Sequence, residues 1–153
     1  MGFRLLLWGC GRIITFLPYE SFEETTKCLD YRRLGKQRIE AYQIIDLLEQ
    51  EKDGVDISKL PWGNHPAVRM WSGYLDLLYN YYNEIVFEWM NRGYKNNMII
   101  FTNTKRLSQC TYPPWLGRKD FHDAHRSKLL QKNYDYYKQF NWDVPLDLEY
   151  MWE

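Results

Sequence analysis

The chain of 153 residues lacks most features that place a protein in a well-marked class. Its three cysteines, Cys10, Cys28 and Cys110, are far apart and form no CxxC pair, so the sequence indicates neither a disulfide framework nor a cysteine zinc site. The early apolar run, Leu5 to Trp8, is too short for a signal-peptide core or a membrane span. We therefore expect a cytoplasmic or nuclear protein that does not enter a membrane.

The motifs of the common enzyme classes are also missing. There is no GxGxxG, P-loop, GxSxG or HExxH sequence, which argues against the usual nucleotide-binding, hydrolase and metalloprotease sites. The formal net charge is zero, but residues 89–119 contain six basic residues and no acidic one, whereas acids gather at 20–24, 46–56 and 143–153. Two interpretations remain open, a cationic face that binds a phosphate backbone and scattered solvated lysines.

The composition is that of one folded domain. A hydrophobic content of 45% is enough for a real core, and we expect an N-terminal extension over residues 1–13 and a single domain over residues 14–153. The predicted fold class is all-α, a compact helical bundle with long irregular loops. Asn64 is the expected N-cap of the longest helix, which runs to near residue 93, and Asp120 that of the helix ending near residue 132. Further helices are predicted over 22–29, after that up to about 51, and as a turn near 134–140.

One helix carries an unusual set of charges. Residues 29–41, LDYRRLGKQRIEA, combine four cations and the carboxylate of Glu40 with an apolar stripe, and Asp30 precedes the cations. At about 100° per residue, Gln37 and Arg38 point toward the core, and Arg33, Gln37 and Glu40 line one flank of the stripe. Burying such groups unpaired would cost several kcal/mol, so we expect either an internal ion pair or a functional site.

The functional interpretation centres on Glu40. A carboxylate beside Lys36, Arg33 and Arg38 is the arrangement that an amine nucleophile and a general acid or base require. We expect Glu40 to lie in a cleft between this helix and the one starting at Pro66, with arginines around the cleft on one side of the molecule, namely Arg32, Arg33, Arg118 and Arg126.

The three histidines, His65, His122 and His125, all stand near predicted helix starts. His122 and His125 have the spacing to face one metal ion, with His65 as a further ligand. Alternatively they are hydrogen-bonded structural residues, or they contact a phosphate together with Arg126 at a helix N-terminus. The spacing does not choose between these interpretations.

Aromatic residues make up 18% of the chain, including 13 Tyr and 7 Trp, which is more than one core needs. Their flat rings with polar tips suit a partly wet surface or stacking onto bases. The surplus predicts a binding face.

Several stretches together resemble a known family. They are TFLPYESF, LDYRRLGKQRIEAYQI, WGNHPAVRMWSGY and PPWLG followed by FHDAHRSKLL. They resemble the small microbial and viral proteins grouped with pyrimidine-dimer DNA glycosylases of the bacteriophage endonuclease V type, from about Thr15 to Trp152. The resemblance implies an all-α fold that bends DNA, extrudes a base and cleaves the glycosidic bond through attack of an α-amino group on C1′, forming a Schiff base.

The resemblance also implies particular site residues. Glu40 is the best match for a helix-borne glutamate of the family and Arg38 for a neighbouring arginine, although their separation differs by one residue from the phage pattern. The family's chains begin almost at the TF pair, so Thr15 should lie next to the α-amine, whereas fourteen residues precede it here. Either the true start is internal, or the extension is removed, or Lys36 supplies the amine, or the lyase chemistry is absent.

The predicted function is therefore a DNA-repair N-glycosylase, with or without AP-lyase activity, that acts as a monomer on double-stranded DNA with a damaged or abasic site and needs no metal or cofactor. The expected catalytic residues are Glu40, Arg38, Lys36 and Thr15. The expected DNA contacts are Arg32, Arg33, Asn64, His65, Arg69, Trp115, Arg118, His122, His125 and Arg126. The alternatives are a non-catalytic nucleic-acid-binding protein and a metal-dependent nuclease that uses His65, His122 and His125.

Overall fold

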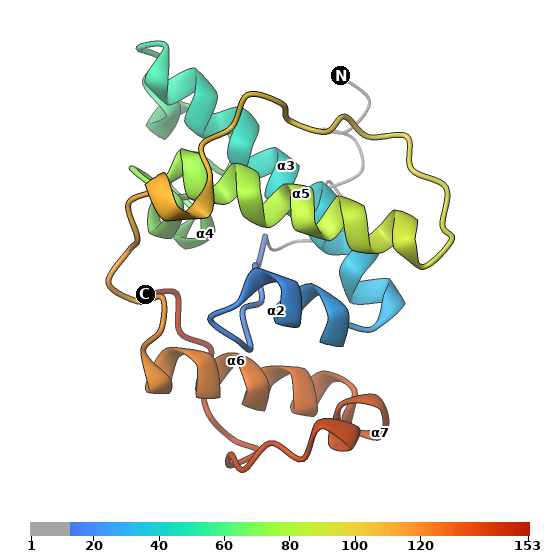
Figure 1. Ribbon diagram of the computed structural model, residues 1–153. Coiled ribbons are helices and arrows are strands. Elements are labelled where there is room, and N and C mark those ends of the chain that lie inside the picture. Colours follow the sequence, from blue (N-terminus) through green and yellow to red (C-terminus); the bar gives the residue numbers. More distant parts are fainter. Residues whose placement is uncertain (1–12) are drawn as a thin grey trace.

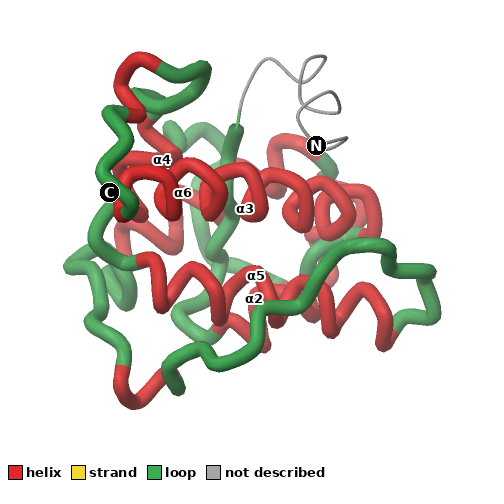
Figure 2. Tube along the Cα trace, turned by 90° about the horizontal axis from the view of Figure 1, so that it is seen from above, coloured by secondary structure: helices red, strands yellow, loops and turns green. Residues whose placement is uncertain are grey.

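A computed structural model of the protein describes residues 13–153, and within this range it contains helices and loops but no strand (Figures 1 and 2). The predicted all-α class is confirmed. The extension predicted over residues 1–13 lies, apart from Ile13, outside the described residues. The α-helices are α2 (Phe22–Cys28), α3 (Tyr31–Lys52), α4 (Pro66–Trp71), α5 (Leu75–Asn91), α6 (Lys119–Lys132) and α7 (Tyr134–Tyr137), and the short 3-10 helices are η1 (Ile57–Lys59), η2 (Leu107–Gln109) and η3 (Lys138–Phe140).

The first helices begin where the sequence predicts. The Ser21 side chain accepts a hydrogen bond from the Glu24 N–H at the start of α2, over 3.2 Å. The carboxylate of Asp30 does the same for the Arg33 N–H at the start of α3. Such caps satisfy backbone donors that have no partner within the helix. They fix the start of α3 and therefore the direction in which its charged residues point.

The single long helix predicted from Asn64 is wrong, because the chain forms α4 and α5 instead. His65 rather than Asn64 is the N-cap, and its Nδ1 accepts a hydrogen bond from the Ala67 N–H over 3.1 Å. The two helices are separated at Gly73, whose φ of 87° lies in the left-handed region that favours glycine. The longest described helix is therefore α3.

The later part of the chain is close to the prediction. Helix α6 starts two residues earlier than expected, so Arg118 is its N-cap and Asp120 lies in its first turn. The predicted turn near residues 134–140 is present as α7 and η3. Together α6 and α7 form a lower layer of the molecule, whereas α3, α4 and α5 form the upper one (Figure 1).

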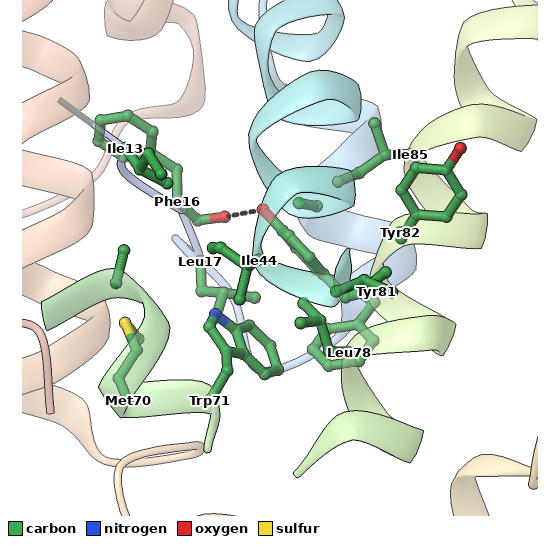
Figure 3. Packing of buried hydrophobic residues seen from close by; sticks show 14 of the residues in the cluster. Ile13, Phe16, Leu17, Ile44, Met70, Trp71, Leu78, Tyr81, Tyr82 and Ile85 are labelled. Atoms are coloured by element: carbon green, nitrogen blue, oxygen red, sulfur yellow. Dashed lines mark hydrogen bonds between the residues drawn. The ribbon is translucent and has the colours of Figure 1, made fainter. Parts of the chain in front are cut away.

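The core lies around the extended segment 13–17. Ile13, Phe16 and Leu17 are buried in one apolar cluster with residues of α3, α4 and α5, including Ile44, Trp71 and Ile85 (Figure 3). Burying each large apolar side chain stabilises the fold by about 1.5–3 kcal/mol. This segment is consequently held from several sides. None of the described helices combines the length and apolar character that crossing a membrane requires.

Candidate active site

Glu40 lies at a small cavity between α3 and α6. Its side chain is only 4% exposed. The cavity has a volume of about 280 Å³, and its walls come from α3, α6, the extended segment and the C-terminal tail. The expected cleft between α3 and α4 is therefore wrong, because α6 rather than α4 forms the opposite wall. The lining residues are Ile14, Arg33, Lys36, Glu40, Lys128, Lys132, Tyr150 and Trp152.

The carboxylate of Glu40 is bound directly to the extended segment. The backbone N–H of Ile14 donates to Glu40 Oε2 over 2.7 Å. The amide of Gln37 supports this contact, since its Nε2 donates to the Ile14 carbonyl over 2.7 Å and lies 3.4 Å from Glu40 Oε1. The backbone nitrogen of residue 14 is thus the main-chain atom held closest to the carboxylate.

The amide oxygen of Gln37 extends this hydrogen-bond network to Phe16 and Tyr81. Its Oε1 accepts from the Phe16 N–H at 3.1 Å and lies 2.9 Å from the Tyr81 hydroxyl. That hydroxyl is also 2.7 Å from the Phe16 carbonyl, the contact drawn in Figure 3. Buried polar groups need such partners, and here they fix the backbone of residues 14–16 against α3.

Burial changes the acidity of Glu40. Loss of solvent raises the pKa of its carboxyl group to about 7, while the Ile14 N–H and the charges of Arg33, Lys36 and Lys132 act in the opposite direction. A group with a pKa near the working pH can both give and take a proton. The site therefore provides a general acid or base without a histidine.

Four cations surround this single carboxylate. Arg33 and Lys36 come from α3, and Lys128 and Lys132 come from α6. Neither α6 lysine was among the site residues predicted from the sequence. Their i, i+4 spacing, which places them on one face of α6, was the available signal, but only the structure shows that this face meets Glu40.

Two of the predicted catalytic residues do not reach the cavity. Arg38 is half-buried on another side of α3, where its guanidinium lies 4.2 Å from the Trp89 ring and donates to Asn96 Oδ1 over 3.1 Å. Two residues along a helix turn the side chain by about 200°, so Arg38 and Glu40 diverge. Thr15 is fully buried and its Oγ1 accepts from Trp71 Nε1, which directs its side chain toward α4.

The predicted histidine site is not formed by the described residues. His125 is fully buried, its Nδ1 accepts from the Leu17 N–H over 2.9 Å, and its Nε2 bonds the Met151 carbonyl over 2.8 Å. His122 is buried as well and bonds the Leu17 carbonyl and the Gly117 N–H. Burial lowers the pKa of both rings, for His125 to about 3. Both ring nitrogens of each histidine thus have protein partners, as the alternative of hydrogen-bonded structural residues expected, and the described residues contain no group of side chains that could hold a metal ion.

Most other predicted DNA contacts lie away from the cavity. Trp115 is buried and bonds the Met70 carbonyl, so it cannot meet DNA. Arg126 bonds the Pro18 carbonyl beside the Tyr19 ring, and Arg118 pairs with Asp120. Asn64 and Arg69 line a separate hollow together with Glu51 and Asp56. His65 touches the Trp152 ring, which lines the cavity, and Arg32 is exposed on the first turn of α3.

A comparison of the chain with known protein families finds a match to one family model. The family model described as pyrimidine dimer DNA glycosylase matches residues 13–102, which is more than half of the chain. The matched range includes Ile14, Arg33, Lys36 and Glu40, whereas α6 and the C-terminal tail follow it. No curated protein and no solved structure matches the chain.

Proposed function

The chain belongs to the pyrimidine dimer DNA glycosylase family, and from this premise we propose that the Glu40 cavity cleaves the N-glycosidic bond of a damaged pyrimidine nucleotide in DNA. The observation that carries the proposal is the 2.7 Å contact between the Ile14 nitrogen and Glu40. Both residues lie within the matched range, and the contact sets a main-chain nitrogen against a buried acid with a pKa of about 7. Cations from two helices then surround the place where a nucleotide with its phosphates would enter.

The proposed reaction uses an amine beside Glu40. The amine nitrogen forms a bond to C1′ of the sugar while the bond from C1′ to the base breaks, and the base leaves with the electron pair. Glu40 takes a proton from the new ammonium group and gives it to O4′ as the sugar ring opens, which leaves an imine. Loss of a C2′ proton with departure of the 3′-phosphate completes an AP-lyase reaction.

The position of Ile14 identifies the best amine. In the full chain its nitrogen is an amide, and an amide nitrogen is a poor nucleophile because its lone pair is delocalised. In a chain that starts at Ile14 the same atom would be an α-amine with a pKa of about 8, already within hydrogen-bond distance of the carboxylate. Lys36 in the same cavity is the rival amine.

The test compares the full chain with a chain starting at Ile14. Both are incubated with duplexes that carry one thymine dimer, one abasic site or no damage, and borohydride is added to trap an imine. We expect the protein to create alkali-labile sites in the dimer duplex and none in the undamaged duplex, and we expect covalent trapping, on the dimer and abasic duplexes, with the shorter chain alone. If neither chain produces alkali-labile sites, the glycosylase proposal fails.

Equal trapping by both chains would instead assign the amine to a lysine. Lys36→Arg keeps the charge and removes the nucleophile, so this variant should then lose the adduct. Binding of damaged DNA by both chains, with neither cleavage nor trapping by either, would favour the second candidate function, a non-catalytic nucleic-acid-binding protein. The amide character of the Ile14 nitrogen in the full chain is the observation that favours this candidate.

A further inference from the structure

Two exposed tyrosine rings lie side by side at the end of the molecule where α3 begins and α5 ends (Figure 1). Tyr31 is 51% exposed and Tyr94 is 39% exposed. Their ring centres are 6.2 Å apart with 31° between the ring planes. We call Tyr31 and Tyr94, with the Trp89 ring behind them, the aromatic shelf.

Contacts within the protein hold the shelf in position. The Trp89 ring lies 4.5 Å from that of Tyr94, and Trp89 Nε1 donates to the Lys95 carbonyl over 3.0 Å. Gly93, with a φ of 89°, turns the chain sharply between these two rings. Tyr94 is consequently held in place before any partner arrives, which reduces the entropy cost of binding.

The surroundings of the shelf are cationic. Arg32 Nε donates to the Tyr31 hydroxyl over 3.1 Å, and the Arg38 guanidinium lies over Trp89. Two carboxylates that neighbour the shelf residues in the sequence have partners of their own, because Asp30 accepts from the Arg33 N–H and the Tyr137 hydroxyl, and Glu88 pairs with Arg92. A surface of this charge is complementary to a phosphate backbone.

The shelf is connected to the cavity along α3. Arg32, Lys36 and Glu40 have i, i+4, i+8 spacing and therefore share one face of the helix. Tyr31 precedes Glu40 by nine residues, which is a rise of roughly 13 Å along the helix axis and about half a turn around it. Lys36 and Arg32 lie between the two in both respects, so a strand with one nucleotide in the cavity reaches the shelf by passing around α3 over these two cations.

We propose that the aromatic shelf stacks an unpaired base of the DNA strand whose damaged nucleotide occupies the Glu40 cavity, an inference that rests on the proposed function. Arg32 and Lys36 contact the phosphates between the two places. Stacking on tyrosine needs no hydrogen bond to a base edge, so the shelf accepts any base. It provides affinity for single-stranded DNA next to a lesion and carries no sequence preference.

The experiment measures binding of the full chain to a fluorescent twelve-residue oligothymidylate and to an undamaged duplex of the same length. Tyr31→Ala and Tyr94→Ala should each weaken binding to the single strand by about tenfold, because base stacking is lost. Binding to the duplex should change by less than about twofold, since paired bases do not reach the shelf. Tyr94→Phe keeps the ring and should bind like the unchanged protein.

Two further variants keep the test decisive. Tyr134→Ala removes a tyrosine on α7 that is 52% exposed, outside the shelf, and should leave binding unchanged. Tyr94→Leu keeps apolar packing against Trp89 without an aromatic face, so it should lose binding even if Tyr94→Ala does not fold. The shelf is overturned if Tyr31→Ala and Tyr94→Leu bind the single strand as the unchanged protein does, or if Tyr134→Ala loses as much.

Failure of the shelf and failure of the proposed function give different results. If the dimer duplex is cleaved while the shelf variants keep full affinity for the single strand, the shelf is wrong and the function stands. If the protein cleaves no damaged duplex but the shelf variants lose tenfold in affinity, the glycosylase proposal is wrong and the shelf remains a binding site for unpaired DNA.

Discussion

Two of the hollows formed by the described residues differ in the sign of their charge. The Glu40 cavity, of about 280 Å³, contains one carboxylate among four cations. A larger hollow of about 590 Å³ beside α2 and α5 has no cation among its lining residues, and its carboxylates are Glu20, Glu23, Glu24 and Glu84. A formal net charge of zero is therefore compatible with one cationic hollow and one acidic hollow. The acidic hollow, which is the larger, repels a phosphate backbone. If the candidate site were chosen by volume alone, the larger, acidic hollow would be selected.

The carboxylates also differ in their access to water. Those on α2 in the larger hollow are exposed, whereas Glu40 is buried and meets a backbone N–H. Exposure keeps a carboxylate in its charged state cheaply, and burial penalises that state unless partners compensate. A buried acid beside an open cationic wall has a reactive proton, which the exposed acids of the other hollow lack.

The difference between the two hollows is tested by making the same substitution, glutamate to glutamine, in each of them. In the chain that starts at Ile14, Glu40→Gln keeps the shape of the side chain and removes its proton transfer, so N-glycosidic cleavage of a dimer duplex should fall by about 10² to 10⁴. Glu84→Gln, in the larger hollow, should leave the rate unchanged. Single-turnover formation of alkali-labile sites measures both. Equal rates for Glu40→Gln and the unchanged protein would remove the catalytic assignment.

A smaller effect follows from the acidity of Glu40. Its pKa is about 7 in the folded protein against an ordinary value of 4.5, so the folded chain holds this proton more tightly than the unfolded chain. The resulting stability is fully present below pH 4.5 and is lost as the pH rises through 7, an effect on the order of 3 kcal/mol. Urea unfolding of the unchanged protein and of Glu40→Gln at pH 5 and pH 8 measures it.

The difference in unfolding free energy between the unchanged protein and Glu40→Gln reports on Glu40 alone, because all other titrating groups are common to both. We expect the unfolding free energy of the unchanged protein to fall between pH 5 and pH 8 by more than that of Glu40→Gln. Parallel pH profiles would show that the carboxyl group is solvated and that the cavity does not raise its pKa.

Local patterns were enough to predict much of the fold. The capping residue Ser21 and the helical period of the apolar residues predict α2 and most of α3, and with them the flank on which Arg33 and Glu40 lie, whereas the cap at Asp30 is known only from the structure. The break at Gly73 was missed because a glycine costs a helix only about 1 kcal/mol and the apolar row continues in phase through α5.

The site could be predicted only where one helix provides it. Arg33, Lys36 and Glu40 share a face of α3, so the period reveals them. Lys128 and Lys132 come from α6, about ninety residues later, and which face of α6 meets α3 is decided by packing of the whole chain. Spacing could not decide between the possible roles of His122 and His125 for a related reason, because it cannot show that Leu17, Gly117 and Met151 already occupy their ring nitrogens.

The smallest expected effect concerns the cationic wall itself. If Lys128 and Lys132 each contact one phosphate, Lys128→Ala and Lys132→Ala should each reduce the salt slope of binding to a dimer duplex by about 0.9. Lys59→Ala is the matched control, because Lys59 is an exposed lysine on η1 outside the cavity lining and its loss should leave the slope unchanged. Affinity measured from 50 to 200 mM salt on the catalytically inactive Glu40→Gln background separates binding from cleavage. A slope that changes equally for all three lysines would mean that the positive charge acts as a diffuse field, and the contrast between the two hollows would then set the direction of approach without forming specific phosphate contacts.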